Sequence, residues 1–347
     1  DTVPGGESNS FWMNNTIECL RIENLSIYLK SSKRVSKGKR SLPFALPKIV
    51  SSLNLSIKER ETLAIVGESG SGKTMTALAI MRLLPENMEL EGRIFYKGKD
   101  LLSLSEEEMR RLRGAEIAMI FQEPMTSLNP VLTIGYQVAE MLITHRGLSK
   151  AEAMTKTVEL LKKVNIPAAQ TRIKDYPHQL SGGLRQRVMI AMAISCNPGL
   201  LIADEPTTAL DVTIQAQILD LIDRLKEEHA LTVLLITHDL GIVRQHSDRV
   251  AVMYAGSLME VADTERLFLS PLHPYTTGLI QSLPELRGRA LKPIPGSIPS
   301  VKEIPEGCRF WPRCDRAIDE CKGLEPELRE VEQGHLVRCL RIAQGSL

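Results

Sequence analysis

The sequence predicts an α/β protein whose strands form a largely parallel sheet. Three short apolar runs, at residues 62–66, 200–203 and 232–236, are unbroken rather than alternating, which is typical of strands buried on both faces. Segments with helical periodicity lie between these runs. Strands that alternate with helices in this way indicate parallel pairing through crossover helices, and hence the α/β class.

Two of the expected helices carry start signals. Ser105 with Glu108, and Ser149 with Glu152, have the spacing of a capping box, in which each side chain bonds to the other residue's backbone N–H. The stretch at residues 123–195 is mostly helical in pattern and interrupts the series of strands. We therefore expect it to form an inserted helical subdomain.

The composition bounds the size and class of the protein. The chain of 347 residues is long enough for about two domains, at roughly 100 to 200 residues each. Its formal net charge of +1 lacks the basic excess that attracts nucleic acid, so nucleic acid is not an expected partner. The sequence shows neither an apolar run of about 18 residues nor a secretory signal, so the chain is expected in the cytoplasm.

Three segments differ from the rest in composition. Residues 1–12 resemble a tag remnant, and Met13 is the expected native start. Residues 271–347 are rich in proline with little periodicity, so they are expected to form a C-terminal extension to a domain at residues 16–270. Residues 30–40 hold six basic side chains, which are expected either in a solvated loop or against anionic lipid headgroups.

The most specific motif is GESGSGKT at residues 67–74, which follows an apolar strand and precedes a helix-compatible run. Its glycines allow a tight turn in which several backbone N–H groups converge on phosphate oxygens. Lys73 can reach the β and γ phosphates, and the Thr74 hydroxyl suits Mg²⁺. The residues expected to contact a nucleotide here are Gly67, Ser69, Gly70, Ser71, Gly72, Lys73, Thr74 and Met75.

Two acidic residues end another expected strand. In LLIADEP, Asp204 and Glu205 stand at the carboxyl end of the apolar run, which is the edge where the phosphate loop also lies. One carboxylate can contact Mg²⁺ there, and the next can polarise an attacking water. Such a pair is weak evidence by itself, but beside a phosphate loop it indicates nucleotide hydrolysis.

A second anion-binding pattern is LSGGLRQR, at residues 180–187. Ser181, Gly182 and Gly183 open a helix whose first N–H groups point outward. A structural helix cap explains a lone SGG equally well, so the pattern is specific only together with the other motifs.

Three further motifs complete an ordered set. Gln122 follows the apolar AMIF, TALD contains Asp211, and LLITHD ends a strand in His238. In this order the set resembles the ATP-binding cassette (ABC) family over roughly residues 19–270. The resemblance implies a P-loop NTPase with a RecA-like core, an antiparallel β subdomain and an inserted helical subdomain, here followed by a cysteine-bearing extension.

The resemblance also implies a role for each motif. Residues 67–74 would be the Walker A loop that binds ATP, Asp211 the D-loop aspartate and His238 the switch histidine on the γ-phosphate. Departures from the common pattern at Leu184 and Ala209 remove no group that catalysis needs, so hydrolysis is expected. The implied catalytic residues are Lys73, Gln122, Glu205 and His238, and the implied Mg²⁺ ligands are Thr74, Gln122 and Asp204.

A dimer follows from the same resemblance. Ser181, Gly182 and Gly183 would contact the γ-phosphate of a nucleotide held by the opposite subunit, so two subunits would close head to tail on two ATP molecules. Tyr28 would stack on adenine, although the basic insertion places it unusually far from the loop in sequence. An ordinary strand tyrosine is the alternative.

Several segments narrow the resemblance to one group. IFQEPMTSLNP, YPHQLSGG, HPYT and the cysteine-bearing tail resemble the D-type ATPase subunit of bacterial dipeptide and oligopeptide importers, a group that includes nickel importers. This implies a heterodimer with an F-type ATPase, two permease subunits and an extracytoplasmic binding protein, at the cytoplasmic face of the inner membrane. The alternatives are an importer ATPase of the same group for nickel or another small solute, and a soluble cassette ATPase that acts on nucleic acid or ribosomes.

The tail holds four of the six cysteines, namely Cys308, Cys314, Cys321 and Cys339. Two disulfides and four unconnected thiols are possible, but a reducing compartment disfavours the first, and a metal would organise a segment with few apolar residues. Four thiolates accept either Zn²⁺ or an iron–sulfur cluster. The resemblance implies a [4Fe-4S] cluster on these four, with Zn²⁺ as the alternative. The other two, Cys19 and Cys196, are expected to be ordinary buried thiols.

Overall fold

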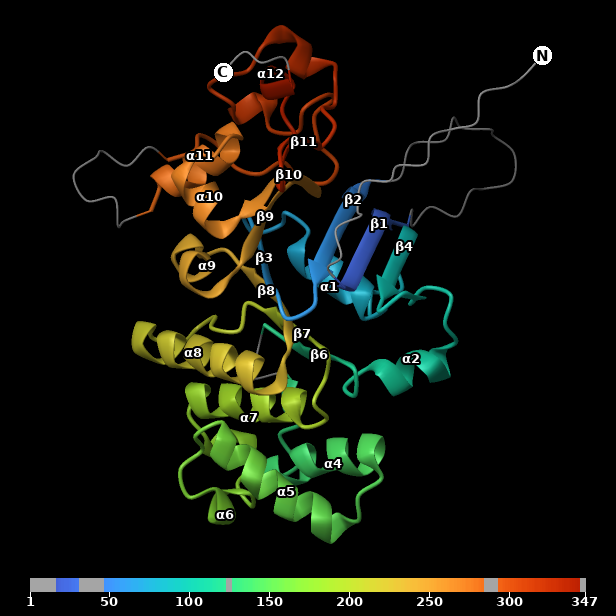
Figure 1. Cartoon of the computed structure of the whole chain (residues 1–347), viewed down its shortest axis with the longest axis vertical. Coiled ribbons are helices and arrows are strands. Elements are labelled where there is room, and N and C mark those ends of the chain that lie inside the picture. Colours follow the sequence, from blue (N-terminus) through green and yellow to red (C-terminus); the bar gives the residue numbers. More distant parts are fainter. Residues whose placement is uncertain (1–16, 31–46, 123–126, 284–292, 344–347) are drawn as a thin grey trace.

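The computed structural model describes residues 17–30, 47–122, 127–283 and 293–343. The leader at residues 1–12 and the basic stretch beyond Lys30 lie outside the described residues. The described chain forms one large mixed sheet, one small antiparallel sheet and helices that cover them (Figure 1).

The large sheet contains the predicted parallel strands at its centre. Its strand order is β11-β12-β10-β9-β3-β8-β7-β6, and the pairs β3/β8, β3/β9, β7/β8 and β6/β7 are parallel. All three predicted strands are confirmed, as β3, β7 and β8. The strands are β3 (Thr62–Val66), β6 (Ile117–Ile120), β7 (Leu200–Asp204), β8 (Thr232–Thr237), β9 (Arg249–Tyr254), β10 (Ser257–Asp263), β11 (Arg329–Glu332) and β12 (His335–Val337).

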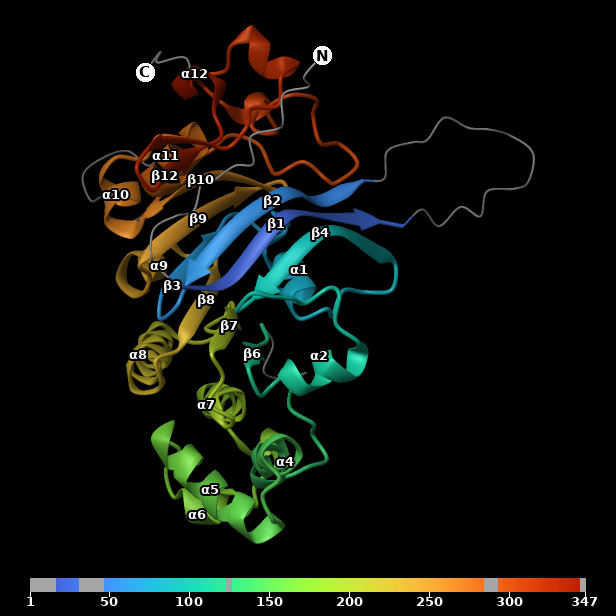
Figure 2. The ribbon, with the colours of Figure 1, turned by 45° about the vertical axis from the view of Figure 1, so that its right-hand side comes forward.

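The small sheet has the order β2-β1-β4-β5, with antiparallel pairing throughout. It lies beside the turn between β9 and β10, where the Ser51 N–H donates to the Gly256 carbonyl over 2.9 Å (Figure 2). Its strands are β1 (Glu18–Leu29), β2 (Lys48–Lys58), β4 (Met88–Tyr96) and β5 (Lys99–Asp100).

Strands β3, β7 and β8 of the large sheet are buried on both faces, which explains the unbroken apolar runs. Along β3, Ala64 and Val66 belong to one core cluster, with residues of α7 and α8. Leu63 and Ile65 point to the other face, where they join residues of the small sheet and α1. Because successive side chains of a strand alternate between faces, a strand covered on both sides must be apolar at every position.

The helices lie between the strands in sequence, as predicted. The capping boxes at the starts of α2 and α5 are both present, so these two predictions are confirmed. Helices α4, α5 and α6 lie at the opposite end of the molecule from the C-terminal segment (Figure 1). The helices are α1 (Lys73–Ile80), α2 (Glu106–Leu112), α4 (Ile134–Arg146), α5 (Lys150–Lys163), α6 (Ala169–Arg172), α7 (Gly182–Ile194), α8 (Val212–His229), α9 (Leu240–His246), α10 (Thr264–Leu269), α11 (Pro274–Gln281) and α12 (Leu340–Ala343), with short 3-10 helices η1 (Pro177–Gln179), η2 (Trp311–Arg313) and η3 (Asp319–Lys322).

The C-terminal segment packs onto the rest of the chain. Strand β12 pairs with β10, with Glu260 opposite Val337, so the segment continues the large sheet. Its buried residues Cys308, Phe310 and Cys321 belong to the main core cluster. Packing on the sheet therefore supplies the burial that the segment's own sequence lacks.

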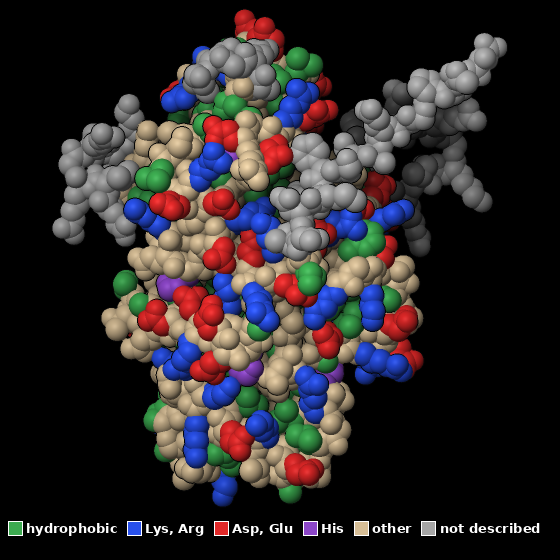
Figure 3. Space-filling view, viewed as in Figure 1, with side chains coloured by type: hydrophobic (Ala, Val, Ile, Leu, Met, Phe, Trp, Pro, Cys, Tyr) green, Lys and Arg blue, Asp and Glu red, His purple; other side chains and the backbone are tan. Residues whose placement is uncertain are grey.

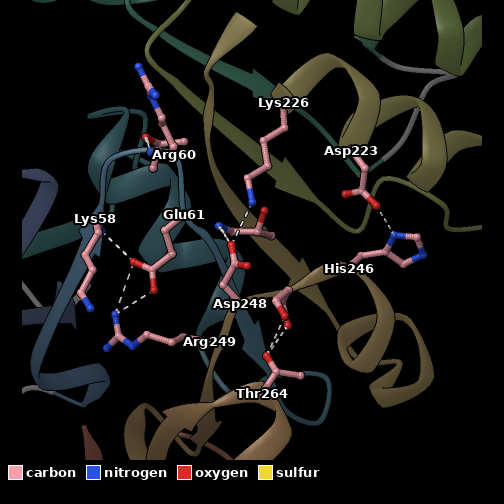
Figure 4. A network of polar contacts seen from close by, with 12 residues as sticks. Lys58, Arg60, Glu61, Asp223, Lys226, His246, Asp248, Arg249 and Thr264 are labelled. Carbon is pink, nitrogen blue, oxygen red and sulfur yellow. Dashed lines mark hydrogen bonds and ion pairs between the residues drawn. The ribbon is translucent and has the colours of Figure 1, made fainter. Parts of the chain in front are cut away.

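The amino-terminal edge of the parallel strands is held by ion pairs (Figure 4). Glu61 pairs with Arg249 over 3.1 Å, and both side chains are largely buried. Asp248 accepts from the Thr62 N–H over 2.7 Å and pairs with Lys226. These contacts tie β3 to β9 at the edge away from residues 67–74, which follow the carboxyl end of β3.

Candidate functional site

The loop at residues 67–74 adopts a backbone that only glycine tolerates at two of its positions. Gly67 has φ +155°, and a Cβ there would lie 2.0 Å from the Met253 carbonyl oxygen. Gly72 has φ +104°, and a Cβ there would lie 3.2 Å from the Ile49 carbonyl oxygen. The loop is thus wedged between β9 and β2, and it turns directly into α1.

Lys73 begins α1 and lies buried inside this loop. Its Nζ donates to the Gly67 carbonyl over 2.7 Å and to the Glu68 carbonyl over 3.1 Å. Burial lowers the pKa of Lys73, although the nearby Glu205 and Asp204 carboxylates raise it. The side-chain oxygen of Ser71 is also buried, and it has no hydrogen-bond partner among the described residues. A phosphate group would satisfy both the unpaired hydroxyl and the lysine, so the loop fits the expected nucleotide.

The next residue of α1 meets the end of β7. The Thr74 hydroxyl donates to Asp204 Oδ1 over 3.2 Å, and Asp204 is 1% exposed. Burial raises the pKa of Asp204 to about 6. A buried carboxylate beside a hydroxyl fits Mg²⁺, because the cation would stabilise the charge that burial disfavours.

Glu205 follows Asp204 and is held by three side chains. Its carboxylate accepts from Gln122 Nε2 over 3.0 Å and from the Thr208 hydroxyl over 2.9 Å. The Nδ1 atom of His238 lies 3.3 Å from its other oxygen. Burial raises the pKa of Glu205, but the bonds from Thr208 and His238 outweigh it and hold the pKa below its usual value.

These groups come from the carboxyl ends of four neighbouring strands. Lys73, His238, Glu205 and Gln122 follow β3, β8, β7 and β6, which is also the strand order in the sheet. Glu205 has φ +45°, a conformation that is strained for a residue with a side chain. The turn directs the carboxylate toward Gln122 and His238. The site can therefore hold a triphosphate at one end and an ionised carboxylate beside it.

The second anion-binding motif lies elsewhere on the chain. The Ser181 hydroxyl accepts from the Leu184 N–H and caps α7. The Asp211 carboxylate caps α8 by accepting from the Ile214 N–H over 3.0 Å. Both motifs line one open cavity of about 970 Å³, together with Gly182 and Gly183. The structure thus brings the SGG and TALD motifs together in one concave surface.

Tyr28 is connected to the loop through strand pairing. It pairs with Lys48 across β1 and β2, and the Lys48 ammonium lies 5.4 Å from the centre of its ring. Its hydroxyl donates to Glu91 over 2.8 Å. A Cβ on Gly72 would lie 3.2 Å from the carbonyl oxygen of Ile49, the residue after Lys48 in β2, so this pairing offsets the separation that the basic insertion creates in sequence.

The structure corrects the prediction of a metal site in the tail. Cys308, Cys314, Cys321 and Cys339 do line a common cavity, and its volume is about 20 Å³, which is room for about one water molecule. Burial raises the pKa of Cys308 and Cys314 to about 11.

Across the described part of the chain, no group of three or more His, Cys, Asp or Glu side chains is arranged to hold a metal ion. The expectation of an iron–sulfur cluster is therefore wrong, and the same geometry provides no Zn²⁺ site. The other two cysteines, Cys19 and Cys196, are buried as predicted.

Sequence reasoning missed two sets of residues at the site. Thr208, which bonds to Glu205, stands three residues after it, so the local sequence carried a usable signal. Arg313 and Tyr275 both contact Glu68 of the loop, and their distance along the chain gave no such signal.

Comparisons with known proteins agree with this geometry. A family model described as "ABC transporter" matches residues 50–208. The oligopeptide transport ATP-binding protein AppD of Bacillus subtilis is 52% identical over 294 residues, which cover 84% of this chain and 90% of that protein. The chain belongs to the ABC transporter ATPase family. An ABC ATPase binds ATP with Mg²⁺ and hydrolyses it, and this activity is that of the chain.

Other relatives of this ABC ATPase cover both its parts. A model described as "Oligopeptide/dipeptide transporter, C-terminal region" matches residues 259–321. The oligopeptide transport ATP-binding protein OppD of Salmonella typhimurium is 49% identical and covers 84% of this chain and 88% of its own length. The dimeric ATP-binding cassette MJ0796, bound to ADP and Pi, has a TM-score of 0.59 at 30% identity, and covers 71% of this chain and 98% of its own.

Proposed function

We propose that this ABC ATPase powers a bacterial importer of oligopeptides. The proposal is supported by the relatives, which are oligopeptide transport ATP-binding proteins, and by the match of residues 259–321 to the C-terminal region of such transporters. The partners would be an F-type ATPase subunit, two permease subunits and an extracytoplasmic binding protein. The chain would sit at the cytoplasmic face of the inner membrane.

The membrane-spanning part of such an importer would belong to the permeases. Among the described residues, no helix has both the length and the apolar character to cross a bilayer. On the face of the molecule in Figure 3, Lys and Arg side chains are interspersed with Asp and Glu. Within the chain, we assign the ATPase domain to residues 16–270, its helical subdomain to residues 123–195 and the extension to residues 271–347.

The observation that carries the mechanism is the convergence of Lys73, Glu205, Gln122 and His238 at one edge of the sheet. The backbone N–H groups of residues 67–74 and the Lys73 ammonium would bind the phosphates of ATP. Lys73 would then exchange its two carbonyl partners in the loop for phosphate oxygens.

The metal-binding residues would be Thr74, Asp204 and Gln122. When bound there, Mg²⁺ supplies positive charge to the β and γ phosphates. The Thr74 hydroxyl and the Asp204 carboxylate already face each other over 3.2 Å. Gln122 donates to Glu205, so it would also couple the metal-binding residues to the catalytic carboxylate.

Glu205 would orient the attacking water and accept its proton. Its pKa is held below the usual value, so the carboxylate is ionised near pH 7 and can accept a hydrogen bond from water. The His238 side chain would hold the other side of this group and face the γ-phosphate. The strained backbone of Glu205 fixes the direction of the carboxylate before the nucleotide arrives.

A second subunit would complete the nucleotide-binding site. The cavity that Ser181, Gly183 and Asp211 share is open and about 970 Å³ in volume, which can receive the γ-phosphate end of a partner's ATP and the partner's own loops. We assign Ser181, Gly182 and Gly183 to that role, and Tyr28 to the adenine of the chain's own ATP.

Reconstitution tests the proposed function. The chain would be co-expressed with its neighbouring permease genes and the partner ATPase gene, and the complex would be placed in liposomes with the binding protein. We expect oligopeptides to stimulate ATP hydrolysis and to accumulate in the lumen. Stimulation by a nickel chelate alone, or co-purification with nucleic acid and no permease, would overturn the proposal.

A further inference from the structure

The C-terminal extension contacts the ATP-binding loop directly. Arg313, in η2, donates from Nη1 to both carboxylate oxygens of Glu68, over 3.0 and 3.1 Å. Glu68 is the second residue of the loop at residues 67–74. The Arg313 side chain is 8% exposed and that of Glu68 is 28% exposed, so this ion pair is shielded from water on one side.

Arg313 is itself held rigidly. Its Nε donates to the Pro295 carbonyl over 2.7 Å, and its Nη2 donates to the Gly296 carbonyl over 3.3 Å. The guanidinium also lies over the ring of Tyr254, 5.6 Å from its centre. Because all three nitrogens have partners, the guanidinium is fixed in orientation, and the Glu68 carboxylate is held with it.

Tyr275, which also lies after residue 270, contacts the backbone of Glu68. The Glu68 N–H donates to the hydroxyl of Tyr275, in α11, over 3.1 Å. Tyr275, Tyr254 and Phe310 pack with ring centres 4.8 to 5.2 Å apart, so this hydroxyl is anchored in an aromatic cluster. The carbonyl of Glu68 accepts from Lys73, which links these contacts to the phosphate-binding lysine.

We propose that Arg313 is a positioning residue of the ATP-binding loop, which holds Glu68 and neutralises its carboxylate beside the site of the ATP phosphates. A carboxylate in a phosphate-binding loop repels the polyanion that the loop must accept. Without a nearby cation, only mobile ions would screen this partly exposed charge, and at low ionic strength they screen it weakly. The extension thereby sets the affinity of the loop for nucleotide. The inference rests on the proposed role of residues 67–74 in binding ATP.

The test measures the affinity of the full-length chain for Mg-ATP by calorimetric titration at low temperature, where hydrolysis is slow. Arg313→Met keeps the apolar stem and removes the charge, so we expect its Kd to rise about tenfold. Glu68→Gln keeps an oxygen that accepts from Arg313, so we expect Kd no higher than in the wild type. The double variant should bind within about threefold of Glu68→Gln, because the repelling charge is gone.

The salt dependence separates charge from structure. The loss in Arg313→Met should shrink between about 50 and 500 mM salt, since mobile ions screen the partly exposed Glu68 charge. Arg329→Met is the matched control: Arg329 lies in the same extension, is exposed and pairs with Glu327 over 3.1 Å, and its loss should leave Kd unchanged.

Three results would overturn the inference: a double variant as weak as Arg313→Met, a loss that does not change with salt, or Glu68→Gln binding more than about threefold weaker than the wild type. The last remains decisive even if Arg313→Met does not fold. Lys73→Ala tests the underlying assignment separately. If it binds ATP as well as the wild type, the loop assignment fails, whatever the Arg313 variants do.

Discussion

Replacing His273 by asparagine should remove a defined part of the pH dependence of stability. His273 is 1% exposed and caps α11, where its Nδ1 accepts from the Tyr275 N–H over 3.0 Å. Burial lowers its pKa to about 4. Asparagine is also a good N-cap residue and does not titrate, so His273→Asn preserves the cap bond and removes the proton-binding group.

The sign and size of the effect follow from proton linkage. In the unfolded chain the histidine has its ordinary pKa, about 6.5, so below that pH the unfolded state binds a proton that the native state does not. Stability is therefore lost as the pH falls from 6.5, and the loss is complete only below about pH 4. At pH 5 the difference is 1.5 pH units at about 1.36 kcal/mol each, or about 2 kcal/mol.

Urea unfolding at pH 7.5 and pH 5 measures this quantity. The wild type should lose about 2 kcal/mol more than His273→Asn between the two values. Contributions from the other histidines are common to both proteins and cancel in the comparison. The variant can be less stable at both values, because a smaller side chain leaves space, and this does not affect the slope. If the wild type and His273→Asn lose the same free energy of unfolding between pH 7.5 and pH 5, His273 is not held neutral in the native state.

Four further outcomes are expected. Glu205→Gln should bind ATP as the wild type does but hydrolyse it at least ~100-fold more slowly, as measured by titration and by phosphate release. Gly183→Val would place its Cβ 2.8 Å from Ile214, so ATP binding to the single chain should persist while turnover in the assembled transporter falls at least ~10-fold. Tyr28→Ala should weaken binding of ATP about 5-fold and that of free triphosphate not at all, since only adenine can stack on the ring. Ser149→Ala should lower the free energy of unfolding by about 1 kcal/mol in urea and leave ATPase activity unchanged, because it removes only the cap of α5.

Much of the site could be predicted from local sequence. The strands at residues 62–66, 200–203 and 232–236 are found because burial on both faces requires an apolar side chain at every position. The capping boxes of α2 and α5 are found because their bonds span only three residues. Motifs at the carboxyl ends of parallel strands must meet at one edge of the sheet, so the convergence of Lys73 with Glu205 is expected from their order alone.

The tail shows where local patterns are insufficient. Four cysteines in a short segment predicted a cluster, but the spacing of thiols says nothing of the volume between them or of their burial. In the structure the tail packs on the core through Phe310, and the cysteines enclose a cavity of about 20 Å³. Its organisation thus comes from contacts with β10 and the aromatic cluster, which involve residues far away in the chain.

The strands, the helix starts and the ABC motifs can be predicted from the amino-acid sequence, because each depends on side chains a few residues apart. The pairing of β11 and β12 with the large sheet, and the contact between Arg313 and a carboxylate 245 residues earlier in the chain, are visible only in the folded chain. Such contacts depend on how whole elements pack. The residues next to either partner in the sequence therefore do not indicate which distant residue it contacts. The extension is therefore joined to the ATP-binding loop by an ion pair that no motif records.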